Sequence, residues 1–194
     1  ETGGWKWQET VLDGDNLDKS LLCGVAVSKQ RVFYIEKNSL TYWYSQTVGE
    51  VQGTLHSVDL SALVSKGGSL AAIAGWTCDG GEGMDDLTVF ITTEGEVLIY
   101  GGNNPDNAND WSLKGKYYIG RPIGKHCVLP YRGDLAIICE DGYIPLSSTI
   151  YMAQSGVSGN AYSDKIRGLV LSRIKDNKKL SGWQAIVYPR GGYA

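Results

Sequence analysis

The chain has 194 residues and a formal net charge of −3, with 26 glycines and 12 tyrosines but only two phenylalanines. This near balance of charge argues against the basic footprint that nucleic-acid binding requires, and the one notable basic cluster, at residues 175–179, is most simply a solvated helix end. No apolar run approaches the ~20 residues of a membrane span, so we expect no membrane insertion. The composition is typical of a turn-rich β-protein with one good core or two small domains. Because the chain does not begin with methionine, we expect a fragment of a longer protein.

Residues 1–20 form a polar N-terminal segment. Asp13, Asp15 and Asp18 lie close together in it, in a spacing that resembles a calcium-binding loop. The glycine at the sixth position and the distal glutamate of such a loop are missing. A solvated loop is therefore the better interpretation.

The first strand pattern occupies residues 21–60. An apolar strand at 21–27 precedes a hairpin at 31–44, which reverses through Lys37 and Asn38, and a fourth strand is expected at 54–60. Its histidine, His56, has no Ser, Cys or acid at a recognisable catalytic spacing. We expect it to be a packed or surface residue.

The second unit contains the clearest hairpin, at residues 79–100, after an apolar strand at 69–76. Leu87, Val89 and Ile91 alternate with Thr88, Phe90 and Thr92. This period of two predicts a strand with one face toward the core and the other toward solvent. Gly95, between two glutamates, can take a positive φ in the turn. A fourth strand is expected at 111–119.

The loop that enters this hairpin is the densest group of carboxylates in the chain, with Asp79, Glu82, Asp85 and Asp86. Calcium prefers several carboxylate and carbonyl oxygens on flexible backbone. Glycine and aspartate also build turns for local steric and hydrogen-bonding reasons. We favour a structural loop, keep these four residues as weak candidates for a cation site, and predict no cofactor and no catalytic residue.

Residues 103–111, N-N-P-D-N-A-N-D-W, resemble a degenerate Asp-box, the hairpin motif of sialidase-type propellers. The serine, glycine and threonine of that motif are absent. Its role is in folding: an aspartate bonds turn amides while the tryptophan packs between sheets.

The third unit has a strand at 125–130 and a hairpin at 134–146. Glu36, Glu94 and Glu140 occupy the turn of each hairpin at intervals of about fifty residues, a period found in propeller blades. We therefore predict a mainly β fold of repeated antiparallel hairpins in four-stranded, β-propeller-like blades over 21–154, with a meander or sandwich as the alternative. Closed propellers use about four to eight blades, which agrees with a fragment.

Residues 155–194 change character. Ile166, Leu169, Val170 and Ile174 recur at helical spacing and predict one short helix over 163–176. Ser163 or Asp164 would be its N-cap. Residues 183–188 read as a further strand, which the chain leaves unfinished.

The four cysteines form no C-x-x-C pair and lie in or beside apolar strands. They are Cys23, Cys78, Cys127 and Cys139. We expect buried free thiols and a reducing compartment, with two disulfides as the alternative that an even number of cysteines leaves open.

Several runs, read together and in order, resemble the virion structural proteins of short-tailed bacteriophages and related prophages. These proteins form the tail nozzle or stabilise the packaged DNA below the portal. The resemblance covers most of the chain from about Leu21 onward and rests on the runs at 31–40, 79–94, 118–124, 133–147 and 183–189.

This resemblance implies a β-propeller-type domain in a homo-oligomeric ring around the DNA channel, in contact with other tail and adaptor proteins. The function would be mechanical and non-enzymatic, in a virion assembled in the host bacterial cytoplasm. Sequence-specific nucleic-acid binding is not expected, since a basic lining would hold the phosphate backbone.

Two other functions remain open. A glycan-binding or sialidase-like propeller would use Trp43, Trp76 and Trp111 as sugar platforms, although no motif ties the arginines into the cluster that a sialidase needs. A generic protein-interaction propeller is the other alternative.

Overall fold

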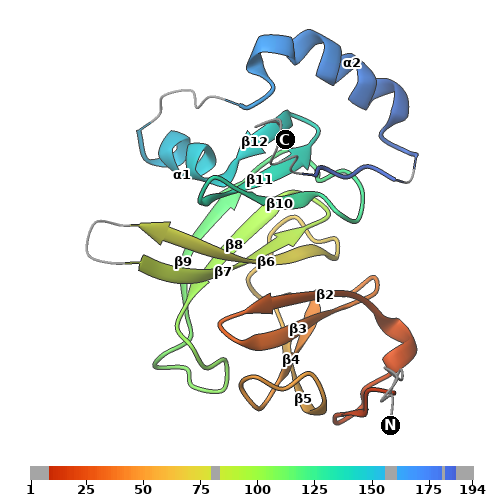
Figure 1. Cartoon of the computed structure of the whole chain (residues 1–194), viewed down its shortest axis with the longest axis vertical. Coiled ribbons are helices and arrows are strands. Elements are labelled where there is room, and N and C mark those ends of the chain that lie inside the picture. The colour runs from red at the N-terminus through yellow and green to blue at the C-terminus, as the bar shows by residue number, and fades with distance from the viewer. Residues whose placement is uncertain (1–8, 80–83, 156–160, 181, 187–194) are drawn as a thin grey trace, which may run out of the picture.

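The computed structural model describes residues 9–79, 84–155, 161–180 and 182–186. These residues form three sheets that follow one another in the sequence and stack along the longest axis of the molecule, with helices at one end (Figure 1). The prediction of a mainly β, antiparallel fold is confirmed.

The N-terminal sheet is an antiparallel meander with a short parallel strand, β1, at the edge formed by β5. A 3-10 turn, η1 (Lys19–Leu21), leads into the meander. The strands are β1 (Leu12–Asp13), β2 (Leu22–Ser28), β3 (Arg31–Glu36), β4 (Thr41–Ser45) and β5 (Gly53–Asp59).

The central sheet and the third sheet repeat the meander. The central sheet consists of β6 (Leu70–Asp79), β7 (Met84–Thr92), β8 (Glu96–Gly101) and β9 (Ser112–Tyr118). The third sheet consists of β10 (Val128–Tyr131), β11 (Asp134–Cys139) and β12 (Gly142–Pro145). It is followed by α1 (Leu146–Ser155), the 3-10 turn η2 (Asp164–Ile166) and α2 (Arg167–Asn177).

The middle of the central sheet, β7 and β8, is buried on both faces, which corrects the expectation of one solvent face for β7. Val89 and Ile91 pack toward the third sheet, while Phe90 packs toward the N-terminal sheet. Even Thr88 and Thr92 are fully buried. Alternation in this strand therefore separates two cores instead of separating core from solvent.

The core between the N-terminal and central sheets is aromatic. Phe90 lies 4.5 Å from Tyr42, centroid to centroid, and meets Phe33 edge to face. Trp111 stacks on Tyr100 at 5.3 Å. The core between the central and third sheets is aliphatic and includes Leu146 at the start of α1.

The outer face of the third sheet is covered by α2 instead of a further sheet. Ile174 of α2 is buried with Ile123 and Ile138, and Val170 and Leu171 pack against them. The stack is therefore sheet, sheet, sheet and helix, with the N-terminal sheet at the far end (Figure 1).

The three turn glutamates occupy similar places in each meander: Glu36 is the last residue of the second strand, and Glu94 and Glu140 lie just after it, before the third strand. Gly95 takes a φ of +81° in the central turn, where a Cβ would collide with the carbonyl oxygen of Ile119. The glutamates have different partners, which are Trp43, Arg121 and Lys178 in chain order. The position repeats, but the contacts do not.

The C-terminal predictions are confirmed only in part. The predicted helix exists, but α2 begins at Arg167, after Ile166 as N-cap, and Ser163 instead bonds the amide of Tyr143 through its hydroxyl. Ile166 and Leu169 of the expected apolar stripe are exposed. A strand was expected at 183–188, and for the described residues 182–186 this prediction is wrong. There, Gln184 makes only a single bridge to His126. Helix α1 was not predicted.

The described cysteines are free, as expected, but they are not all buried. Cys127 and Cys139 lie in the aliphatic core, and burial raises the pKa of their thiols to about 11 and about 12. Cys23 is exposed on β2, which corrects its assignment to the core. Among the described residues, no helix is long and apolar enough to cross a membrane.

A buried carboxylate fixes the connection between the first two sheets. Glu96, at the start of β8, is fully buried and accepts hydrogen bonds from the backbone amides of Ser65 and Lys66. Its other partner is the Lys116 ammonium at 2.9 Å. Burial by itself raises the pKa of Glu96, but these donors outweigh it and hold the pKa below its ordinary value of 4.5.

We expect Phe90→Ala to destabilise the fold by about 3–5 kcal/mol, because it removes a ring from the middle of the aromatic core. Urea denaturation followed by tryptophan fluorescence measures the change. Val25→Ala is the control, since Val25 is 67% exposed and should change stability by less than about 0.5 kcal/mol. Equal effects of the two substitutions would contradict the sheet stacking.

Glu96→Gln should cost about 1.5–3 kcal/mol at neutral pH, because three donors lose a charged acceptor. Since the folded pKa lies below 4.5, the stabilisation is complete above that pH and is lost as the pH falls through the folded pKa. Denaturation curves from neutral to acidic pH should therefore converge for the two proteins. A constant difference at every pH would show that the charge of Glu96 is not involved.

Candidate functional site

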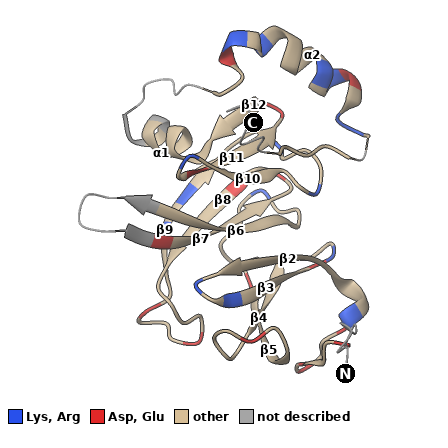
Figure 2. Ribbon diagram, in the orientation of Figure 1, with Lys and Arg blue, Asp and Glu red and all other residues tan. Residues whose placement is uncertain are grey.

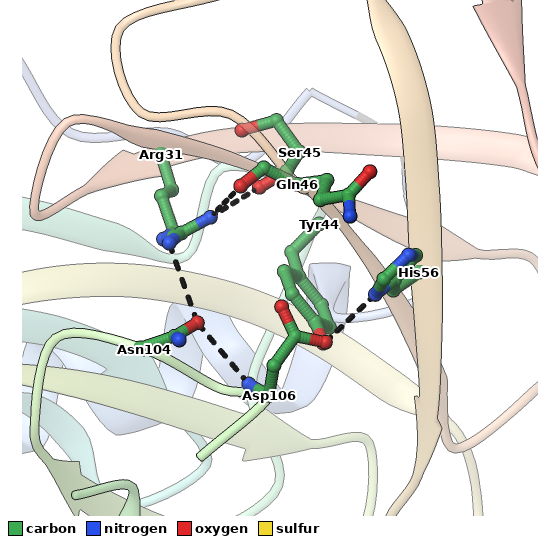
Figure 3. A network of polar contacts seen from close by, with 7 residues as sticks. All are labelled: Arg31, Tyr44, Ser45, Gln46, His56, Asn104 and Asp106. Carbon is green, nitrogen blue, oxygen red and sulfur yellow. Dashed lines mark hydrogen bonds and ion pairs between the residues drawn. The ribbon is translucent and has the colours of Figure 1, made fainter.

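The densest polar network among the described residues lies where the edge of the N-terminal sheet meets the loop between β8 and β9. Arg31 comes from β3, Tyr44 from β4 and His56 from β5, whereas Asn104 and Asp106 come from the loop (Figure 3). These side chains converge from segments 50 to 73 residues apart in the sequence.

Arg31 is the buried cation of this network, with only 7% of its surface exposed. Its guanidinium donates to the carbonyl oxygens of Ser45 and Gln46 on its own sheet. It also reaches the carbonyl oxygen of Asn103 and the side-chain oxygen of Asn104, both at 3.3 Å. The fork of donors on one guanidinium thus joins β3 to the loop of the next sheet.

Asp106 is the anion of the network. One carboxylate oxygen accepts from the Tyr44 hydroxyl at 2.7 Å and contacts His56 Nδ1 at the same distance. Burial by itself raises the pKa of Asp106, but the hydrogen bonds from Tyr44 and His56 outweigh it and lower the pKa. Asp106 therefore stays ionised and holds the loop against β4 and β5.

An open pocket of about 360 Å³ adjoins Asp106 and His56. Asp13, Asp15 and Thr54 contribute exposed polar groups to its wall, and Trp43 and Leu55 contribute apolar ones. Trp43 is 5% exposed and donates its indole N–H to Glu36. The pocket is therefore polar, and its single indole is largely covered.

The loop at 103–111 carries out the folding role predicted from its likeness to an Asp-box. The Asp110 carboxylate accepts hydrogen bonds from the backbone amides of Asn103 and Asn104, at 2.7 and 2.9 Å. Those two hydrogen bonds lower the pKa of Asp110. Trp111 packs between the sheets against Phe33 and Tyr100.

The weak cation candidates at 79–86 lie mostly outside the described residues. Glu82 is outside them altogether, and the side chains of Asp79 and Asp85 are not described. Asp86 is exposed on β7 and accepts from the Thr77 hydroxyl at 2.8 Å. Within the described part of the chain, no three His, Cys, Asp or Glu side chains are placed to hold a metal ion, and the cation site at 79–86 stays a prediction.

The other residues singled out in the sequence make contacts within the fold. Asp18 caps η1 through Ser20, and hydrogen bonds from Ser20 lower its pKa. Of the three proposed sugar platforms, Trp76 lies in the aliphatic core and Trp111 in the aromatic one, while Trp43 reaches the pocket wall.

Sequence reasoning named His56 but missed its partner. Asp106 follows it by fifty residues and belongs to another sheet, so no local spacing connects the two. The sequence feature that could have indicated this pairing is the Asp-box-like loop at 103–111, which places Asp106 between the N-terminal and central sheets. Chemically, the network ties two sheets together: its described carboxylate, phenol and guanidinium all bond within the protein.

Comparisons of the chain with protein-family models, with curated proteins and with solved structures gave no match.

Arg31→Lys should destabilise the protein by about 1–3 kcal/mol, because one ammonium cannot replace a fork that bonds four oxygens. Arg31→Ala should cost more, since the carbonyl oxygens would stay buried without a donor. Chemical denaturation measures both. The matched control is Arg173→Lys, at an exposed position of α2. An equal loss of stability at positions 31 and 173 would contradict the role of Arg31 in joining β3 to the loop between β8 and β9.

Proposed function

We propose that this chain is a non-catalytic structural module built from propeller-like blades. The observation that carries the proposal is the repetition of one meander in consecutive sheets, which stack face to face in chain order. The first strand of the central sheet, β6, contacts β2 and β3 on one side and β10 and β11 on the other. Propellers likewise repeat a small antiparallel sheet as consecutive blades.

The side-chain chemistry supports a mechanical role. The buried charged groups, Arg31 and Glu96, bind backbone atoms of neighbouring segments and so connect the N-terminal and central sheets. A buried hydrogen bond of 2.7 Å between Ser28 and Thr88 links the same two sheets. These contacts resist separation of the sheets, which is what a mechanical component requires.

The particular protein that we propose is a tail component of a short-tailed bacteriophage or prophage, at the nozzle or the DNA-retaining position below the portal. The ordered sequence runs that resemble those proteins support this choice. The overall charge of −3 also suits a conduit along which DNA must slide.

Glycan binding is the second candidate, and the pocket beside Trp43 favours it. Its exposed carboxylates and hydroxyl groups could accept and donate hydrogen bonds to a sugar, and an indole lies in its wall. The largely covered indole makes this function the weaker of the two.

The tail function predicts that the protein is part of assembled virus particles. Antibodies raised against the chain should place gold label at the tail, below the capsid, of particles purified from cells that carry the gene. Particles free of label, from cells that do contain the protein, would contradict this function. A glycan array tests the second candidate, since selective binding that is lost in Asp106→Ala would favour it.

A further inference from the structure

The two ends of the sheet stack both expose apolar side chains. At one end, β2 turns Ala26 toward the central sheet and Val25 and Val27 away from it, where they are 67% and 65% exposed. At the other end, Leu169 lies on the outward side of α2, opposite buried Ile174, and is 60% exposed. In Figure 1, α2 lies at one end of the long axis, and the N-terminal sheet lies on the other side of the central and third sheets.

The exposed valines of the N-terminal sheet form one surface, which we name the valine face: Val25, Val27, Val48 and Val51. The loop that carries Val48 and Val51 is fastened to that surface. The amide of Gly49 donates to Gln30, in the turn after Val27, and the Tyr34 hydroxyl donates to the carbonyl of Val51. Tyr34 is the cross-strand neighbour of Val25.

The second surface, which we name the helix face, comprises Ile166, Leu169 and Leu180. All three are more than half exposed, at 56%, 60% and 62%. Charged residues adjoin them in the sequence, among them Lys165, Arg167 and Lys179, and exposed apolar residues rimmed by polar ones are typical of protein–protein contact sites.

The two ends carry opposite charge. Residues 9–52 contain six acidic side chains and four basic ones, one of which is the buried Arg31. Residues 161–180 contain six basic side chains and two acidic ones. Figure 2 shows the blue Lys and Arg positions along α2, at the end of the stack away from the N-terminal segment. Such surfaces attract each other and repel a copy of themselves.

From this arrangement we propose that the valine face of one copy of the chain binds the helix face of a second copy. The contact is heterologous, because two different surfaces meet, so it propagates into a closed ring or an open filament. A valine-to-valine dimer would bring like charges together. The inference rests on the proposed function for its biological role, where it names the surfaces that join neighbouring subunits.

Mass measurements by sedimentation velocity test the contact with three purified chains: the natural sequence, Val25→Asp with Val27→Asp, and Leu169→Asp. The natural chain should grow in mass from micromolar to millimolar concentration, and less so in high salt, which screens charge. Each variant alone should stay a monomer. Circular dichroism and a cooperative unfolding curve confirm that each variant is folded.

Mixing the two variants is the decisive step. The valine-face variant keeps its helix face and the Leu169 variant keeps its valine face, so an equimolar mixture should form a dimer of one copy each and nothing larger. The control is Asn109→Asp, an exposed loop position that adds a charge away from both faces, and it should associate like the natural chain.

A natural chain that remains monomeric at millimolar concentration would overturn the inference. So would a dimer that persists in the Leu169→Asp variant, because that result means that the valine face pairs with itself. Either result leaves the location of the protein in virus particles untouched. Conversely, association in solution with no label on particles would overturn the tail function alone.

Discussion

The fold depends on one constraint: the two middle strands of the central sheet, β7 and β8, are covered on both faces. Each of these strands must supply two apolar surfaces, and β7 does so with Val89 and Ile91 on one side and Phe90 on the other. Burial on both sides makes an unpaired polar group costly, and the buried threonines of β7 are paired: Thr92 accepts from the amide of Glu96, and Thr88 shares a hydrogen bond with Ser28. The indole N–H of Trp76 on β6 is an exception, since it is buried without a partner. The position of every other element follows from this sheet, since the N-terminal sheet covers one face and the third sheet covers the other.

Polar groups between the sheets fix the position of each sheet relative to its neighbour. Apolar contact between sheets is non-directional, so by itself it permits sliding. Arg31, Glu96 and Asp106 oppose that sliding, because each bonds partners on a neighbouring segment at a defined position. The cost of burying such charges is offset only when their hydrogen bonds are complete. These groups therefore specify one arrangement of the sheets more than they add to net stability.

Local patterns in the sequence predicted local structure well. The three hairpins, their fourth strands at 54–60 and 111–119, and the positive φ of Gly95 all follow from alternation and turn chemistry. What failed was any inference that required knowledge of the neighbouring layer. Alternation in β7 cannot reveal that both of its faces are covered, and the apolar spacing of α2 cannot reveal that Ile166 and Leu169 point away from the third sheet. The pairing of His56 with Asp106 was hidden for the same reason.

The two ends of the stack are chemically unlike, and this asymmetry bears on how such a module could be used. A sheet that exposes Val25 and Val27 presents the same kind of surface that the central sheet buries internally. At the opposite end, α2 covers the third sheet with Ile174 and turns Leu169 and a basic surface outward. A stack that ended in two sheet faces could add units at either end through one type of contact. With a sheet at one end and a basic helix at the other, a junction between copies would have a direction, and a directional junction that repeats with a fixed rotation is the geometric condition for a closed ring.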